Sequence, residues 1–356
     1  MQSRKADVHF EIERRAIRTT RWAPTTPPAS LDEGQVLLKL ERAALTSNNV
    51  SYALSGDMLD YWGFFPTDPT WGRLPVMGFG RVVASANPDV SVGGRYFGFY
   101  PLADHHVVSA RPSAAGFSDN AAWREKHAAA YRSFDVAPST PQDDALLLFR
   151  GLYITSFLLE DFLREQGHFH SRQVVVVSAS SKTAIALAHC LRRSSSVEVV
   201  GLTSANNVEF VRSLGEYHHV ISYDELGALP ALASVIVDMA GNSQTLSKIY
   251  SVLNRNVKHC ASVGATHWDA PRHGVTIPEP KPQFFFAPTQ LAKRGKDLGR
   301  EVLNSRIADA LSVFIDSTQS WLKIRHIVGG SAITDLYAAL VNGAVPPEDG
   351  NVVSFE

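Results

Sequence analysis

The chain has 356 residues, of which 45% are hydrophobic and 19% are charged. This composition is typical of a globular protein with a sizeable core, and the length favours two domains over one. The 34 basic and 35 acidic residues give a net charge of −1 with no basic run, which argues against a nucleic-acid partner. No stretch approaches the roughly 18 continuous apolar residues of a membrane span, and the polar start lacks the apolar core of a signal peptide. We therefore expect a cytoplasmic protein that binds neither membrane nor nucleic acid, with a homodimer left open.

The first third of the chain has the pattern of short β-strands. Val36, Leu38 and Leu40 alternate with residues of the opposite face, which is the period of a half-buried strand. Further along, an Asn-Pro-Asp turn at 87–89 and a Gly-Gly turn at 93–94 separate short runs rich in valine and aromatic residues. This spacing predicts a small barrel-like β domain.

The composition changes between residues 111 and 141, where NAAWREKHAAAYRSF (120–134) is predicted as a short helix inside an insertion. From Asp143 and Asp144, which can cap a helix start, apolar residues recur at helical spacing as far as Gly167.

Strands and helices alternate after this helix. We predict strands at residues 174–177, 197–204, 218–223, 234–241, 258–264 and 283–288. Such alternation predicts a doubly wound parallel sheet with helices on both faces. The last segments depart from the alternation and are expected to return to the first domain. We therefore expect one domain from residues 1–140 with 322–356, and an inserted nucleotide-type domain at 141–321.

The stretch VVVVSASSKTAIALA (174–188) leads from a buried strand into a helix through small residues but has no glycine. Ser and Ala stand where a dinucleotide-binding turn has glycine, so close approach of a phosphate is partly kept. The amides and dipole of the helix start favour an anion, Ser180, Ser181 and Thr183 add hydroxyl donors, and Lys182 adds a positive charge. The alternative is an ordinary strand-to-helix turn in which the serines only cap the helix.

The order of segments resembles the medium-chain dehydrogenase/reductase superfamily, and within it the zinc-free quinone and enoyl reductases. ERAALTSNNVSYALSG (41–56) is similar to the family's N-x-x-D segment. PVMGFGRVVASANPDVSVGGRYFGF (75–99) is similar to its P-x-x-x-G-x-E-x-x-G-x-V stretch followed by V-G-D-x-V. GLTSANNVEFVRSLGEYHHVISY (201–223) follows its second strand, helix and L-G-A-D run. The resemblance implies an α/β protein with a GroES-like β-rich catalytic domain and a Rossmann-type parallel-sheet domain.

Several departures from the family pattern point to a divergent branch. Phe79 stands in place of the usual glutamate before Gly80, Gly94 replaces the V-G-D aspartate, and the glycine-rich turn is rich in serine. In zinc-dependent relatives a cysteine and a G-H-E histidine hold the metal, and the matching places here are Thr46 and Phe79. The resemblance therefore implies an enzyme that works without zinc.

Cysteine and histidine spacing also argues against a metal centre. A structural zinc site needs four closely spaced cysteines, and the sequence has only Cys190 and Cys260, which we expect to be small core residues. His105 and His106 are adjacent on a predicted strand, where neighbouring side chains face opposite ways, so they are not expected to share an ion.

The end of the second predicted strand indicates the cofactor. An acidic side chain there would bond the ribose 2′-hydroxyl of NAD, but this strand ends with Thr203, Ser204 and Asn206 and has no carboxylate. We expect NADPH, whose 2′-phosphate would meet no repulsion and could accept hydrogen bonds from Ser204, Asn206 and Lys182. Phe286, at the last predicted strand, is included in the predicted cofactor site. The alternative is that these polar residues only cap the next helix.

A bulky aromatic wall is predicted in YALSGDMLDYWGFFPTDPTW (52–71). Tyr52, Trp62, Phe64 and Phe65 are the predicted substrate-pocket residues, suited to an apolar or aromatic enone, ketone or quinone. The alternative is that most of these rings belong to the core.

The resemblance also implies a proton donor. In enoyl reductases of this family a tyrosine shortly after the glycine that ends the N-x-x-D segment donates to the substrate, and here Tyr61 follows Gly56. The leading hypothesis is hydride transfer from NADPH with Tyr61 as donor and Tyr52 and Tyr100 as rivals. The alternatives are a non-redox lyase or aldol-type enzyme using Tyr61, Tyr100 or His105 as acid or base, and a protein that binds NADPH without catalysis.

Overall fold

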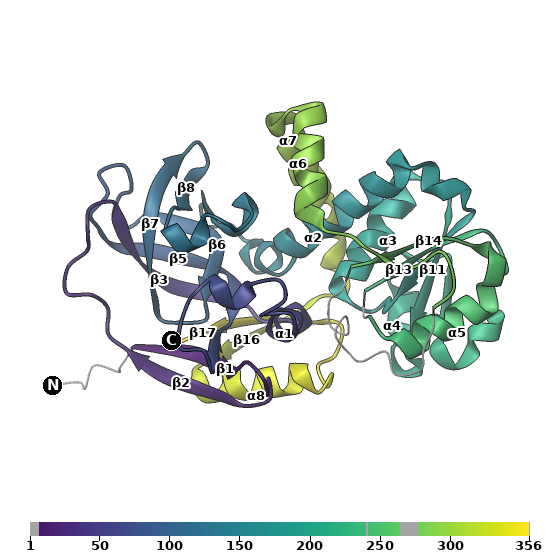
Figure 1. Ribbon diagram of the computed structural model, residues 1–356, viewed down its shortest axis with the longest axis horizontal. Helices are drawn as coiled ribbons and strands as arrows, with labels where there is room; N and C mark the ends of the chain where they lie inside the picture. The colour runs from purple at the N-terminus through teal and green to yellow at the C-terminus, as the bar shows by residue number, and fades with distance from the viewer. Residues whose placement is uncertain (1–6, 240, 264–276, 356) are drawn as a thin grey trace. The chain divides into compact units, whose positions relative to one another are not determined.

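The computed structural model describes residues 7–239, 241–263 and 277–355 (Figure 1). The chain divides into two compact units, Met1–Leu148 with Lys323–Glu356 (unit 1) and Phe149–Leu322 (unit 2). Residue 240 of the strand predicted at 234–241 and residue 264 of the strand predicted at 258–264 lie outside the described residues. Among the helices of the described ranges, none is long and apolar enough to cross a membrane.

Unit 1 is built around an eight-stranded sheet that closes into a barrel. Its strand order is β16-β17-β3-β5-β6-β9-β8-β7, and β3 also pairs with β7. The side chains of Val36, Leu38 and Leu40 on β3 are buried, as the period-2 pattern predicts. The strands are β3 (Gln35–Ala44), β5 (Pro75–Ser85), β6 (Arg95–Pro101), β7 (His105–Ser113), β8 (Gly116–Asp119), β9 (Ser133–Val136), β16 (Lys323–Val328) and β17 (Asp349–Ser354).

A smaller sheet and two helices complete unit 1. The sheet has the order β2-β1-β4, formed by β1 (Asp7–Glu13), β2 (Thr20–Thr25) and β4 (Trp71–Arg73). The helices are α1 (Ser47–Leu54) and α8 (Gly330–Val341). Near the end of the chain, Val352 of β17 lies opposite Ala44 of β3 in an antiparallel pair. The C-terminal segment is therefore an integral part of the barrel.

The helix predicted at residues 120–134 is wrong. This segment forms two short 3-10 turns, η2 (Ala122–Arg124) and η3 (Ala129–Tyr131), followed by strand β9. Phe117 of β8 and Phe134 of β9 lie opposite each other with stacked rings 5.0 Å apart, and both are buried. This cross-strand pair requires extended backbone, so tertiary packing overrides the local helical propensity of an alanine-rich segment.

Unit 2 contains a six-stranded parallel sheet with the order β12-β11-β10-β13-β14-β15. This is the 3-2-1-4-5-6 order of a dinucleotide-binding sheet, so the predicted doubly wound α/β fold is confirmed. The strands are β10 (Gln173–Val177), β11 (Glu198–Thr203), β12 (His219–Ser222), β13 (Ser234–Asp238), β14 (Val257–Ser262) and β15 (Gln283–Phe284).

Helices cover both faces of this sheet (Figure 1). Val174 and Val176 belong to one hydrophobic cluster and Val175 and Val177 to another, which explains why four consecutive valines are all buried. The helices are α2 (Asp143–Glu165), whose first residues belong to unit 1, α3 (Lys182–Ser194), α4 (Val208–Ser213), α5 (Ser243–Leu253), α6 (Ala287–Leu298) and α7 (Arg300–Thr318). Further 3-10 turns are η1 (Tyr61–Gly63), η4 (Gly167–His170), η5 (Ala205–Asn207), η6 (Tyr223–Ala228) and η7 (Asn254–Asn256).

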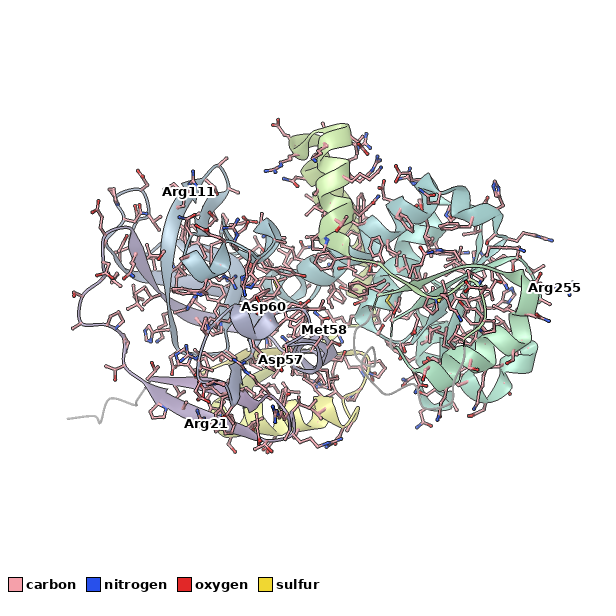
Figure 2. The ribbon with its side chains drawn as sticks, viewed as in Figure 1. Arg21, Asp57, Met58, Asp60, Arg111 and Arg255 are labelled. Atoms are coloured by element: carbon pink, nitrogen blue, oxygen red, sulfur yellow. The ribbon has the colours of Figure 1, made fainter. Side chains whose placement is uncertain are left out.

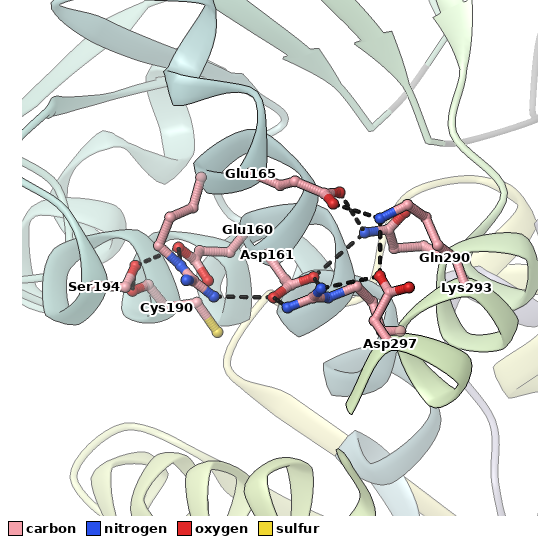
Figure 3. Close-up of polar contacts among 10 residues, drawn as sticks. Glu160, Asp161, Glu165, Cys190, Ser194, Gln290, Lys293 and Asp297 are labelled. Carbon is pink, nitrogen blue, oxygen red and sulfur yellow. Dashed lines mark hydrogen bonds and ion pairs between the residues drawn. The ribbon is translucent and has the colours of Figure 1, made fainter. Parts of the chain in front are cut away.

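A polar network fastens α6 to α2 in unit 2 (Figure 3). The buried carboxylate of Asp161 pairs with Nε of Arg294 at 2.7 Å and with Nη2 of Arg164 at 2.9 Å. Beside it, Glu160 accepts a 2.6 Å hydrogen bond from the hydroxyl of Ser194 on α3. Buried carboxylates with several donors hold their neighbours in one arrangement, so this network fixes the start of the α6–α7 pair.

Helix α2 ends in a left-handed turn. Gly167 has φ +57°, and His168, Phe169 and His170 continue at φ +49°, +51° and +56°. The ring of Phe169 stacks on the imidazole of His259 with centroids 4.1 Å apart. Non-glycine residues rarely adopt this conformation, and the stack helps to hold it.

Candidate functional site

The serine-rich turn of unit 2 begins with a residue in the left-handed conformation. Ser178 directly follows β10 and has φ +59°. Its amide donates a 2.8 Å hydrogen bond to the phenol oxygen of Tyr223, and the next amide, of Ala179, donates to the carbonyl of Leu202 at 2.9 Å. Glycine adopts this backbone conformation without strain, and a glycine-rich dinucleotide-binding turn uses glycine for this tight geometry. The turn therefore keeps the tight geometry at a conformational cost.

The four predicted phosphate-binding residues lie at the start of α3. Ser181 is the N-cap, and its hydroxyl accepts from the amide of Ala184 at 3.3 Å. Lys182 and Thr183 form the first helical turn. Because the first amides of a helix have no partner inside it, this end of α3 can receive an anion.

Ser180 connects the turn to the end of β11. Its hydroxyl oxygen is 3.1 Å from Nδ2 of Asn207 and 3.4 Å from the hydroxyl of Thr203. Ser204 and Asn206 lie at η5, directly after that strand. The structure thus brings the turn and the β11 corner together, at the carboxyl ends of adjacent parallel strands.

Two acidic groups near this edge, Glu209 and Asp238, have partners within the described residues. Glu209, on α4, pairs with Arg212 at 3.0 Å. Asp238 ends β13 and is buried, and one carboxylate oxygen accepts from the amide of Gly241 at 2.9 Å. The sheet switches direction between β10 and β13, where ligands of doubly wound folds bind.

The sequence analysis missed Tyr223 and Asp238 as residues of this edge. Both stand at strand ends, Tyr223 after β12 and Asp238 at the end of β13, and that position was the available signal. Phe286, in contrast, follows β15, which two strands separate from β10. Its ring stacks on that of Phe284, 6.1 Å away, and 38% of the residue is exposed.

Unit 1 gathers several of the predicted aromatic residues into one buried cluster. The ring of Tyr61 lies 4.5 Å from Tyr52, 5.4 Å from Phe64 and 6.1 Å from Tyr131. Burial raises the pKa of the Tyr61 phenol well above its ordinary value, and the neighbouring tyrosines raise it further. The phenol therefore stays protonated, and a hydrogen bond from its hydroxyl to that of Tyr131 contributes to the raised pKa. Tyr131 was missed because its segment was taken to be a helical insertion.

The loop before Tyr61 is held in place by a histidine. Asp60, labelled in Figure 2, has φ +58°, and its carboxylate is 3.0 Å from Nε2 of His127. The ammonium group of Lys126 pairs with the same carboxylate. Burial lowers the pKa of His127 although Asp60 opposes this shift. Residues 122–131 thus fix the η1 loop on which the aromatic cluster depends.

Trp62 packs between two glycines. A Cβ at Gly56 would stand 2.1 Å from its indole nitrogen, and a Cβ at Gly72 would stand 2.3 Å from its ring. The side chain is 3% exposed. Trp62 is therefore a buried core residue of unit 1.

Tyr100 lies inside the barrel, apart from the Tyr61 cluster. It is 0% exposed, and its hydroxyl donates to the carbonyl of Tyr96 at 2.9 Å. Its ring fills the space above Gly78 and Gly80, where a Cβ would come within 3.0 Å and 2.7 Å of the ring. This packing gives a structural reason for glycine at both positions.

Phe64, Phe65 and His105 line a cavity of about 380 Å³ in unit 1. His106 lines the same cavity, although it is adjacent to His105 on β7. Phe64 and Phe65 also belong to the Tyr61 cluster, so these two rings are shared by the cluster and the cavity wall.

The two positions that match zinc ligands in zinc-dependent relatives have structural roles here. The side chain of Thr46 caps α1 together with Asn49. The ring of Phe79 lies 3.9 Å beneath the guanidinium of Arg95. Within residues 7–239, 241–263 and 277–355, no group of three or more His, Cys, Asp or Glu side chains is arranged to hold a metal ion. The residues at these two positions do not fit a zinc ion.

Solved structures with the same fold include proteins described as oxidoreductases. The yhdH oxidoreductase from Salmonella enterica in complex with NADP has a TM-score of 0.60 and 15% identity, over 98% of this chain and 100% of that one. CurA from Vibrio vulnificus in complex with NADPH has a TM-score of 0.62 and 11% identity, over 95% and 94%. The quinone oxidoreductase from Coxiella burnetii has a TM-score of 0.55 and 15% identity, over 99% and 100%. The protein thus has the fold of the medium-chain quinone and enoyl reductases, as the motifs predicted.

The sequence family is more specific than the fold. Residues 43–346 match the family described as "Protein of unknown function (DUF2855)". The chain therefore belongs to the DUF2855 family. No curated protein matches it in sequence.

Proposed function

We propose that this protein is an NADPH-dependent reductase that transfers hydride to an apolar or aromatic enone, ketone or quinone without zinc. The strand–turn–helix of residues 173–194 carries the proposal, because it stands at the switch point of a 3-2-1-4-5-6 sheet and residues 203–207 beside it contain no carboxylate. Relatives of the same fold are described in complex with NADP or NADPH.

Different residues of the chain would bind different groups of the dinucleotide. The amides at the start of α3 and the ammonium group of Lys182 suit a phosphate, and Ser204 and Asn206 suit the ribose or its 2′-phosphate. Bound NADPH would supply the hydride.

Tyr61 is the proposed hydrogen-bond donor to the substrate oxygen. Its phenol is protonated, and the rings around it exclude water, which strengthens a hydrogen bond to a developing enolate. Tyr52 stands beside it as the rival donor.

Two measurements test the proposal. Titration of NADPH fluorescence tests binding, and loss of NADPH absorbance with a panel of enones, quinones and ketones tests turnover. We expect tighter binding of NADPH than NADH, and oxidation of NADPH by at least one apolar carbonyl compound. Equal affinity for both nucleotides, or no nucleotide binding, would contradict the cofactor assignment.

A second candidate is a protein that binds NADPH without turnover. The closed packing of Tyr61 favours it, since the residue is 7% exposed and surrounded by other rings. NADPH binding without oxidation across the whole panel would support this candidate over the reductase.

A further inference from the structure

The cavity of about 380 Å³ in unit 1 has the size of a small-molecule site. Its walls come from separate elements: His9 of β1, Arg73 of β4, His106 of β7, the Phe64–Phe65 pair after η1, and residues 25–28 at the end of β2 and directly after it. It does not include Tyr61 or any residue of unit 2, so this inference does not depend on nucleotide binding.

One wall of the cavity is apolar and aromatic. The rings of Phe64 and Phe65 meet edge to face with centroids 6.3 Å apart. Trp123 and several prolines extend this wall, and Trp123 is 53% exposed. A flat ring of a ligand would pack here with favourable aromatic contacts.

A polar wall faces the same space. Nε2 of His106 is buried and has no hydrogen-bond partner among the described residues. The imidazole stands edge-on to Phe65, with centroids 5.0 Å apart. A buried ring nitrogen without a partner is costly unless a ligand or water satisfies it.

Arg73 is the guanidinium that lines the cavity. Nε of Arg73 is 3.4 Å from Glu11, and its Nη1 donates to the carbonyl of Pro66 at 3.2 Å. Arg21, labelled in Figure 2, pairs with the same Glu11 carboxylate at 2.7 Å and also with Asp68 at 3.3 Å. The cavity-lining residues include no Asp or Glu.

A third guanidinium lies behind the aromatic wall. Arg124 is fully buried and lies 4.5 Å from the ring of Phe64, and its Nε is 3.4 Å from Asp119. Burial, followed by the charges of Arg124, His9 and Arg73, lowers the pKa of His106 to about 3. The imidazole is therefore neutral and offers one donor and one acceptor, while the field around it favours an anion.

We propose that this cavity binds a small aromatic monocarboxylate. The carboxylate would accept hydrogen bonds from Arg73 and His106, and the aromatic ring would pack against Phe64 and Phe65. A guanidinium has five N–H donors in a fork that matches a carboxylate, and the two described contacts of Arg73 leave donors for a ligand. A single charge suits a space that is mostly apolar, whereas a free phosphate would leave the aromatic wall uncovered.

The test measures binding of benzoate to the full chain by calorimetry or ligand-observed NMR, with benzamide as the neutral probe of the same shape. We expect benzoate to bind at least about tenfold more tightly than benzamide, because the charge-assisted contact is lost in the amide. Inorganic phosphate is the third probe and should bind more weakly than benzoate.

Two variants locate the site. Arg73→Gln should weaken benzoate binding by about tenfold or more. Arg81→Gln is the matched control, since Arg81 also contacts one carboxylate, of Glu41, and one backbone carbonyl, of Gly93. Because Arg73→Gln also disturbs Glu11, a second variant, Thr26→Trp, blocks the cavity from an exposed loop position and should abolish binding in a protein that still folds.

Several results would overturn the proposal. The first is no benzoate binding at concentrations up to about 10 mM. The others are equal binding of benzoate and benzamide, tighter binding of phosphate than of benzoate, and an equal loss of benzoate binding in Arg73→Gln and Arg81→Gln. None of these results bears on NADPH binding, so the two proposals fail separately.

Discussion

Replacing Ser178 with glycine should stabilise unit 2. Ser178 has φ +59°, and a left-handed conformation costs an L-residue about 1–2 kcal/mol. Glycine removes this cost but loses roughly 0.5–1 kcal/mol through its greater freedom in the unfolded chain. The hydroxyl contact of Ser178 with Tyr223, at 3.4 Å, is too long to contribute much. The hydrogen bond from the Ser178 amide to Tyr223 is kept, so the expected net gain is about 0.75 kcal/mol, within a range of about 0–1.5 kcal/mol.

Urea denaturation followed by circular dichroism can measure this gain. Ser178→Ala is the control, because it removes the hydroxyl but keeps the Cβ that makes the backbone unfavourable. We expect Ser178→Gly to be more stable than the parent and Ser178→Ala to be no more stable. If the alanine variant is as stable as the glycine variant, the strain assigned to this turn does not exist.

Three further predictions concern the proposed site and its support. Tyr61→Phe removes only the hydroxyl and should lower kcat with the best substrate roughly 10²-fold while NADPH affinity stays level; unchanged turnover would leave Tyr61 as a wall residue. Lys182→Ala should weaken NADPH binding by about 1.5–3 kcal/mol in a fluorescence titration, and an equal loss in the exposed control Lys248→Ala would refute its contact with phosphate. Burial opposes ionisation of Glu216, but His189 and Arg193 hold the pKa of Glu216 below the ordinary 4.5. The ionised carboxylate therefore contributes fully to stability above about pH 4.5, and this contribution is lost as the pH falls further. The parent should therefore lose more stability than Glu216→Gln in urea melts taken from about pH 6 down to about pH 3, and parallel losses would contradict this.

The parallel sheet could be predicted from the sequence because its signal is local. The four valines at 174–177 and the turn residues between later strands lie within short windows, and each window fixes one element. Segment 120–134 could not be predicted in the same way. Its alanines favour a helix, whereas the stacking of Phe134 on Phe117 and the burial of Arg124 depend on residues distant in sequence.

The candidate site, like the fold, could be predicted from the sequence only in part. Ser180, Ser181 and Thr203 could be placed near one another because turns after adjacent parallel strands meet at one edge of the sheet. The contact of Tyr223 with the Ser178 amide could not be predicted, because it depends on the path of η6 after β12. Side-chain directions within an aromatic-rich loop are likewise set by packing.

The indole of Trp62 links two glycines that lie on either side of it in sequence. Any side chain at Gly56 or Gly72 would occupy space that the ring fills, and a smaller residue at 62 would leave both glycines facing a void. The residues at positions 56, 62 and 72 are therefore expected to covary. A substitution at one of them is tolerated only when the others change to compensate. Homologues that lack this tryptophan are expected to carry larger residues at the two glycine positions, so paired substitutions should be visible when DUF2855 sequences are compared.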